Sequence, residues 1–192
     1  MKIRNWSIGT WLLSGFTIIL SFVIVLGITA YSQTDRLSEQ TQTMYNHPLV
    51  VRRALARLEF NVSEVRLEFR NLILAETIVD EQRAIENIER DLLDIEAQFV
   101  IIRDKYLGPE EDVNDAFLAY NLWINVREDN MDLLEQGEIA QVLESINLQG
   151  EESIKINDFI TKVGVLDDFA QSKADELYSN SIKLHDTMTV QL

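Results

Sequence analysis

Cysteine is absent from this sequence of 192 residues, and histidine occurs only twice, at His47 and His185. The absence of cysteine excludes disulfide bonds, thiolate metal ligands, thioether-linked haem and a cysteine nucleophile. A histidine-based metal site or a Ser-His-Asp triad would need one of the two histidines beside partners from distant segments. No Glu-x-x-His spacing is present either. We therefore expect no enzymatic activity, no metal and no cofactor.

Proline and glycine are also scarce. The two prolines stand at positions 48 and 109, there are seven glycines, and no stretch alternates β-branched with polar residues. A β-sandwich would need a turn signal about every eight to twelve residues. The composition therefore favours long helices and an all-α fold.

Positive charge is the third shortage. The chain has 17 basic and 32 acidic residues, for a net charge of −15, and the only charged residues before Asp35 are Lys2 and Arg4. A strongly acidic domain repels phosphate backbones and has no basic stripe to bind them. We expect no nucleic-acid partner.

One long apolar run is present, at residues 8–31. A helix needs about 20 such residues to cross the hydrocarbon core of a membrane. The positive residues before the run predict that residues 1–7 are cytoplasmic and that residues 32–192 lie outside the cytoplasm. The run is flanked by aromatic residues of the kind that favour membrane interfaces: Trp6, Trp11 and Tyr31.

A cleaved signal peptide is the alternative, because Ile-Thr-Ala at residues 28–30 offers a small-residue cleavage site. The apolar run, however, is longer than the roughly 7 to 15 residues of a signal-peptide core. We therefore predict a retained transmembrane anchor.

Beyond the anchor, apolar residues recur at alternating steps of three and four, which is typical of the buried seam of coiled-coil helices. The first seam is Val51, Leu55, Leu58, Val62, Val65, Phe69 and Leu72. The second is Ile85, Ile88, Leu92, Ile95, Phe99, Ile102 and Tyr106. The third is Val113, Phe117, Tyr120, Ile124, Arg127, Met131 and Leu134.

Glycine and proline separate these helices. Gly108-Pro109 follows a second helix predicted from about Asp80 to Leu107, and the third helix is predicted to end near Gly137. A short helical turn is expected at residues 138–147, and a fourth helix from about residue 151 to the end of the chain. Its seam is weaker: Ile156, Ile160, Val163, Ala170, Leu177 and Leu184. We predict an antiparallel four-helix bundle with long, coiled-coil-like helices.

The first helix and the anchor form one nearly continuous helical stretch, interrupted at Asn46-His47-Pro48. Proline removes a backbone donor and clashes with the preceding turn. Two interpretations remain open: a kink, or a fresh helix start with Asn46 as N-cap and Pro48 in the first turn.

The first helix also carries a second apolar stripe. Phe60, Leu67 and Leu74 are seven residues apart and lie about 170° from the seam at 100° per residue. Scattered exposed apolar residues are ordinary in proteins, so the stripe has a structural interpretation without function. The alternative hypothesis is that the stripe packs against its copy in a parallel homodimer.

Several segments resemble a known family. They are residues 44–51 (Met-Tyr-Asn-His-Pro-Leu-Val-Val) with Ala54, residues 69–75, residues 133–137 and residues 174–178. With the N-terminal anchor, they are similar to the four-helix-bundle sensor domain of methyl-accepting chemotaxis receptors, histidine kinases and diguanylate cyclases. The Tyr-Asn-His-Pro start is the most distinctive of these motifs.

The resemblance implies a ligand-sensing ectodomain at a bacterial inner membrane, which would bind a small molecule or a periplasmic protein. Receptors of this family pass a displacement of the fourth helix through a second transmembrane helix to a cytoplasmic output domain. No second apolar span occurs before Leu192, so the chain looks like the sensory part of a longer receptor. The alternative function is a membrane-anchored helical adaptor of the cell envelope.

Arg127 occupies a seam position between Ile124 and Met131. A buried guanidinium needs a carboxylate or a similar acceptor to offset its desolvation. An internal ion pair, or a side chain that extends to the rim of the bundle, would satisfy it. The functional alternative is that Arg127 binds the carboxylate of a ligand, with Tyr120 and Trp123 supplying stacking area.

The first helix also carries a row of arginines. Arg52 and Arg66 flank its seam two heptads apart, and Arg70 is one turn beyond Arg66. An organic anion could be bound between these side chains and a neighbouring helix. Solvated salt bridges between helices are the structural alternative.

Overall fold

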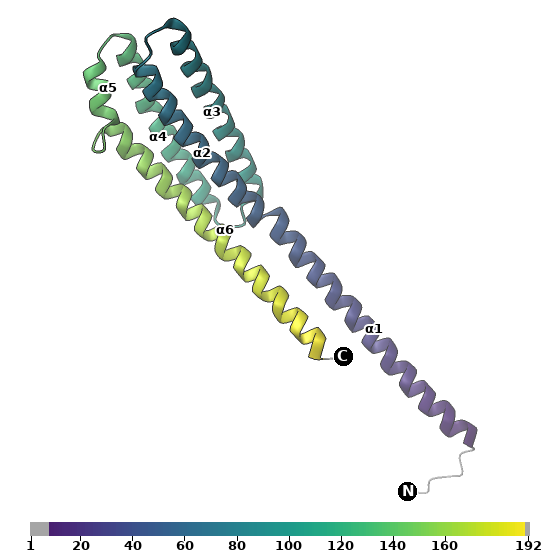
Figure 1. Cartoon of the computed structure of the whole chain (residues 1–192). Coiled ribbons are helices and arrows are strands. Elements are labelled where there is room, and N and C mark those ends of the chain that lie inside the picture. The colour runs from purple at the N-terminus through teal and green to yellow at the C-terminus, as the bar shows by residue number, and fades with distance from the viewer. Residues whose placement is uncertain (1–7, 191–192) are drawn as a thin grey trace. The chain divides into compact units, whose positions relative to one another are not determined.

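The computed structural model describes the backbone of residues 8–190 and the side chains of residues 8–186. It confirms the all-α prediction, and no strand occurs within the described backbone. The helices follow one another as shown in Figure 1. They are α1 (Ile8–Asn46), α2 (Pro48–Ile73), α3 (Ile78–Lys105), α4 (Glu110–Glu135), α5 (Ile139–Ile146) and α6 (Glu151–Val190).

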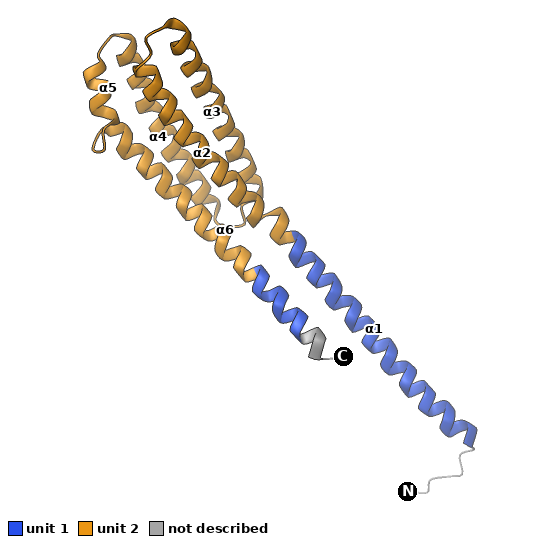
Figure 2. Ribbon diagram, viewed as in Figure 1, with its two compact units in different colours: residues 1–42, 177–192 blue, residues 43–176 orange. Residues whose placement is uncertain are grey.

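The chain divides into two units (Figure 2). Residues 43–176 form the helical bundle, in which α2, α3, α4 and the first part of α6 run antiparallel to their neighbours in chain order. Residues 1–42 and 177–192 form the other unit, which contains most of α1 and the last part of α6. Within that unit, Ser181 donates a hydrogen bond to the side-chain oxygen of Gln40 at 3.2 Å.

The predicted seams of the first two helices form a large part of the core of the bundle. All seven predicted residues of the first seam are buried in α2, and α3 buries Ile88, Ile95, Phe99 and Ile102. Ile85, Leu92 and Tyr106 are partly buried against the same core. Burying the apolar stripes of several long helices in a common core is what stabilises such a bundle. The seam spacing therefore predicted the buried face of α2 correctly and that of α3 in part, since it missed the buried Ala84 and Asp91.

The buried face of α4 is rotated relative to the prediction. The expected seam residues Phe117, Ile124 and Met131 are only partly buried. The deeply buried positions outside the predicted seam are the large Trp123 and three small or polar residues that apolar spacing does not mark: Ala116, Ala119 and Asn130. In α6, the sequence pattern likewise missed Phe159 and Leu166, both fully buried.

The interruption between α1 and α2 is a fresh helix start, but its N-cap is His47 and not Asn46. His47 has φ −123° and ψ −82°, and Pro48 is the first residue of α2. The first turn of a helix tolerates proline because its N–H has no partner there. The ring of His47 makes no capping bond, and its Nδ1 instead lies 3.1 Å from the carbonyl oxygen of Lys105.

Two other helix ends follow from local chemistry. Thr77 caps α3 by accepting a hydrogen bond from the backbone N–H of Asp80 at 3.2 Å, so the helix begins two residues before the predicted Asp80. After α4, Gly137 adopts φ +79°. The N–H groups of Gly137 and Glu138 then donate to the carbonyls of Leu134 and Leu133 at 3.0 and 2.9 Å, a Schellman motif.

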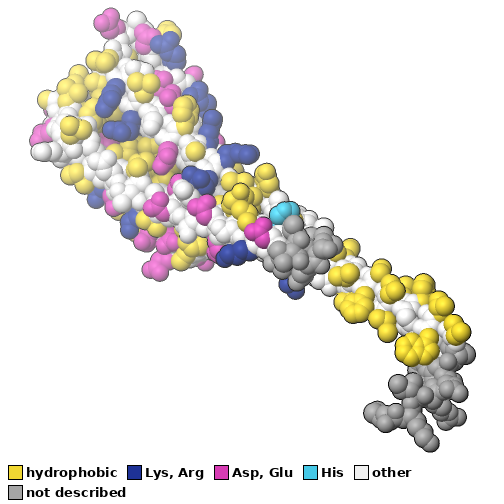
Figure 3. Space-filling view, turned by 60° about the horizontal axis from the view of Figure 1, so that its bottom comes forward, with side chains coloured by type: hydrophobic (Ala, Val, Ile, Leu, Met, Phe, Trp, Pro, Cys, Tyr) yellow, Lys and Arg dark blue, Asp and Glu magenta, His cyan; other side chains and the backbone are white. Residues whose placement is uncertain are grey.

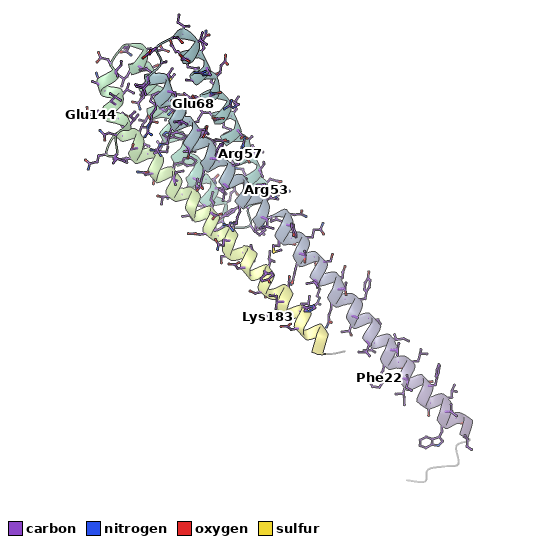
Figure 4. All side chains as sticks on the ribbon, viewed as in Figure 1. Phe22, Arg53, Arg57, Glu68, Glu144 and Lys183 are labelled. Carbon is purple, nitrogen blue, oxygen red and sulfur yellow. The ribbon has the colours of Figure 1, made fainter. Side chains whose placement is uncertain are left out.

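The apolar part of α1 buries no side chain within the described residues. Hydrophobic side chains cover this part of the helix, whereas charged side chains are mixed over the bundle (Figure 3). Phe22 illustrates the outward orientation (Figure 4). By length and composition this is the one helix among the described residues that could cross a membrane.

Substitutions at two glycines are expected to change stability in opposite directions. Gly137→Ala should lower the free energy of unfolding by about 1 kcal/mol, because an alanine at positive φ is strained. Gly164→Ala is the control: this glycine lies inside α6, and an added Cβ would meet nothing within 4 Å. It should raise stability by about 0.5 to 1 kcal/mol. Chemical denaturation followed by circular dichroism measures both, and a stabilising Gly137→Ala would contradict the strain argument.

Candidate functional site

A buried carboxylate is held by three donors inside the bundle. Glu152 Oε1 accepts hydrogen bonds from Arg127 Nη1 at 2.9 Å and from Trp123 Nε1 at 3.3 Å. Its Oε2 accepts from Asn130 Nδ2 at 2.6 Å. The side chains of Arg127 and Glu152 are only 3% and 6% exposed. We call Trp123, Arg127 and Asn130 the carboxylate cage.

The helical repeat places the cage. Trp123, Arg127 and Asn130 are spaced by four and three residues and so share one face of α4. Glu152 lies in the first turn of α6, directly after Gly150. Only glycine fits at position 150, because an added Cβ would collide with the backbone carbonyl of Ser145. This tight loop brings the first turn of α6 against α4.

Arg127 reaches beyond Glu152 to α2. Its Nη2 donates to the carbonyl oxygen of Val65 at 3.2 Å, and its guanidinium carbon lies 4.2 Å from the centre of the Phe69 ring. Its Nε is buried and has no hydrogen-bond partner among the described residues. Burial lowers the pKa of the Arg127 guanidinium because desolvation disfavours the charged form, and the Glu152 carboxylate opposes that shift. Arginine nevertheless stays protonated at neutral pH.

A small pocket adjoins Glu152 at the α2–α6 interface. Its volume is about 20 Å³, which is room for about one water molecule. It is lined by Arg66, Phe69, Arg70, Ile146, Glu152, Ser153 and Ile156. Arg66 and Arg70 are exposed on α2, so two positive side chains stand at the edge of the pocket that contains the buried carboxylate.

Aromatic rings form a cluster next to the cage. Trp123 stacks on Phe159 with ring centroids 6.0 Å apart and planes at 17°, and Tyr120 meets Trp123 edge-on at 6.1 Å. Phe99 and Phe117 complete the cluster around Tyr120. Burial, with a contribution from Glu96, raises the pKa of Tyr120, so its hydroxyl stays protonated. Other side chains of the bundle already occupy the faces of Tyr120 and Trp123 that were expected to stack on a ligand.

Arg52 lies elsewhere. Its Nε donates to Asp167 Oδ1 at 2.8 Å, and the two side chains are 41% and 35% exposed. The hydrogen bond to Asp167 is the main cause that raises the pKa of Arg52. Exposed ion pairs of this kind contribute at most about 1 kcal/mol to stability.

The structure thus gathers four of the six predicted ligand-binding residues around Glu152: Arg66, Arg70, Trp123 and Arg127. Tyr120 contacts Trp123, and Arg52 lies apart. Of the alternatives expected for Arg127, the structure shows the internal ion pair, which is formed with Glu152. Sequence reasoning missed Glu152 and Asn130. Asn130 could have been noticed three residues after Arg127 on the same face, whereas nothing singles out Glu152 among 32 acidic residues.

A second polar group ties α2 to α3. Asp94 accepts hydrogen bonds from Arg57 Nε and Asn61 Nδ2, both at 2.7 Å, and from Gln98 at 2.8 Å. These hydrogen bonds lower the pKa of Asp94, and the bond from Arg57 has the largest effect. No group of acidic or histidine side chains among the described residues could hold a metal ion.

The second stripe of α2 is exposed in the single chain. Phe60, Leu67 and Leu74 are 54%, 48% and 75% exposed. The helix therefore presents one apolar face to the core of the bundle and another to its surroundings. A stripe of large apolar residues at heptad spacing is suited to packing against another helix.

The family model described as a four helix bundle sensory module for signal transduction matches residues 5–184. The chain belongs to this family. The searches of curated proteins and of solved structures found no match to this chain. The sensory module therefore spans the described bundle and the apolar part of α1, as the resemblance had implied.

Removing one member of the buried Arg127–Glu152 pair should lower the free energy of unfolding far more than replacing both members together. Arg127→Met should lower the free energy of unfolding by about 3 to 5 kcal/mol, because Glu152 is left buried without its cation. The double variant Arg127→Met with Glu152→Leu should recover most of that loss. Urea denaturation of the full chain in detergent measures both.

The exposed pair supplies the control. Arg52→Met should cost about 1 kcal/mol or less, since Arg52 and Asp167 are largely solvated. A double variant no more stable than Arg127→Met alone would show that the energy does not come from the unpaired charge.

Proposed function

We propose that this chain is the sensory ectodomain of a bacterial transmembrane signal-transduction receptor of the chemoreceptor type. Residues 8–31 cross the inner membrane, residues 1–7 are cytoplasmic, and residues 32–192 form the periplasmic or extracellular part. The bundle binds a small molecule, an organic anion, or a periplasmic protein, and it acts as a homodimer without catalysis of its own.

The observation that carries this proposal is the family match over residues 5–184, which includes the apolar segment as well as the bundle. The apolar segment supports the membrane part, because its large side chains are exposed along a helix long enough to span a bilayer. Along the chain, only His47 separates α1 from α2. A change in the packing of the bundle therefore has a short helical path to the membrane segment.

Signalling then requires two packings of the bundle whose populations a ligand changes. A ligand shifts such an equilibrium only by its difference in affinity for the two packings. Small axial shifts of helices are among the known forms of such transitions. The helices available to report the shift are α1 and α6, which both extend beyond the bundle unit.

The dimer is supported by the exposed stripe of α2. Two copies related by a two-fold axis along α2 would bury Phe60, Leu67 and Leu74 against the same residues of the partner. Arg57, labelled on α2 in Figure 4, lies beside the stripe, with its guanidinium carbon 5.7 Å from the centre of the Phe60 ring.

Cysteine cross-linking tests the dimer directly, since the natural sequence has no cysteine. Phe60→Cys, Leu67→Cys and Leu74→Cys should each form a disulfide-linked dimer in membranes under mild oxidation, because identical positions meet across a two-fold axis. Glu89→Cys, exposed on α3, is the matched control and should remain largely monomeric. Absence of self-linking at all three stripe positions would contradict the proposed interface.

Ligand binding is tested by calorimetric titration of the full chain with a panel of organic acids. Arg66→Ala and Arg127→Ala should each weaken binding of a responding acid at least about ten-fold, as expected for loss of a charge-assisted hydrogen bond. Arg83→Ala is the control, because Arg83 is an exposed arginine that pairs with Asp80 on α3. Unchanged binding in both test variants would remove these arginines from the site.

A further inference from the structure

The cage has the donor arrangement of a carboxylate receptor. All three donors lie on α4, and the one acceptor comes from a different helix. Both oxygens of Glu152 are bonded, one to the indole and the guanidinium and the other to the Asn130 amide. A guanidinium that is 97% buried strengthens such bonds, because water does not compete for them.

The cage is not saturated by Glu152. Arg127 Nε is buried and unpartnered among the described residues, so the guanidinium retains an unused donor. Leaving a buried donor without an acceptor costs free energy. Nε shares its edge of the guanidinium with Nη2, which donates to the Val65 carbonyl, so a bidentate carboxylate could use Nε only by replacing that bond as well.

A route for an anion to approach lies at the small pocket. Glu152 forms part of its wall, and the exposed Arg66 and Arg70 stand at its edge. Positive side chains at the mouth of a site attract anions and raise their local concentration. The space beside Glu152 holds only about 20 Å³, so a ligand could bind the cage only by displacing the side chain of Glu152.

We propose that the carboxylate cage is a binding site for small organic carboxylates, and that Glu152 is its built-in, displaceable occupant. The side chain of Glu152 beyond Cβ is CH2–COO⁻, which has the same heavy atoms as acetate. The proposal rests on the proposed function for its biological meaning, whereas the binding claim rests on the cage geometry.

Displacement of Glu152 would have a defined structural effect. Glu152 belongs to the first turn of α6, and its bonds are the described polar links between that turn and α4. Ser153, the next residue, donates to the carbonyl of Ile146 in α5 at 3.0 Å. A ligand that takes the cage therefore releases the first turn of α6 from α4 while its link to α5 remains.

The indole of Trp123 supplies the readout. Replacing Trp6 and Trp11 by phenylalanine leaves one tryptophan, whose Nε1–H bonds Glu152 directly. The full chain with these two changes is the reference, labelled with ¹⁵N-tryptophan and titrated with sodium acetate. Sodium chloride at matched ionic strength controls for salt. In Glu152→Ala, acetate should shift the indole resonance of Trp123 in a saturable way. The apparent affinity for acetate should be at least about ten-fold tighter than in the reference, because the Glu152 side chain no longer competes for the cage.

Thermal unfolding gives an independent measurement. Near ten times its dissociation constant, acetate should raise the Tm of Glu152→Ala by about 3 to 6 °C relative to chloride. The double variant Arg127→Met with Glu152→Ala should show neither the resonance shift nor the rise in Tm. If Glu152→Ala does not fold, Glu152→Gln replaces it, because it keeps the volume of the side chain and removes its charge; acetate should then bind more tightly than in the reference.

Two results would overturn the cage as a ligand site. One is an acetate response no larger than that to chloride in the Glu152 variant. The other is an equal response when Arg127 is also replaced. Either result leaves the cysteine cross-links and the Arg66→Ala titration unaffected, so failure of the cage is distinguishable from failure of the proposed sensory function.

Discussion

The buried charge of Arg127 is the constraint on which the packing of α2, α4 and the first turn of α6 depends. A guanidinium enclosed by aromatic and aliphatic side chains needs acceptors within reach, and here they come from two other helices, at Glu152 and at the Val65 carbonyl. Apolar heptad seams repeat every seven residues, so a shift of one helix by a heptad places similar side chains opposite each other. A single polar layer removes that ambiguity, because only one register brings Arg127, Glu152 and Val65 together.

The sequence predicted the parts of the fold that depend on local spacing. Every seam residue of α2 from Val51 to Leu72 is buried, because large apolar residues there follow the helical repeat without exception. In α4 the same reasoning chose Phe117 and Ile124, since they are large and apolar, whereas the chain buries Ala116 and Asn130 more completely. A buried face made of small and polar residues gives no periodic apolar signal.

The candidate site was predictable only in part, for the same physical reason. Arg127 could be identified from the sequence because it is a charged residue at a seam position that is otherwise apolar. Its partner Glu152, however, lies 25 residues away and on another helix. Pairing at that distance is decided by tertiary packing. Arg52 and Arg66 look equivalent in sequence, yet Arg52 meets the solvated Asp167 and Arg66 borders the pocket beside Glu152. Their difference lies in what α6 places opposite each of them.

The single residue between α1 and α2 also determines how this junction is joined to α3. The ring of His47 faces the carbonyl oxygen of Lys105, an acceptor with no hydrogen of its own, so the ring must donate from Nδ1. Lys105 is the last residue of α3, so this bond joins the start of α2 to the end of α3. A side chain without an N–H or O–H donor at position 47 could not make this bond.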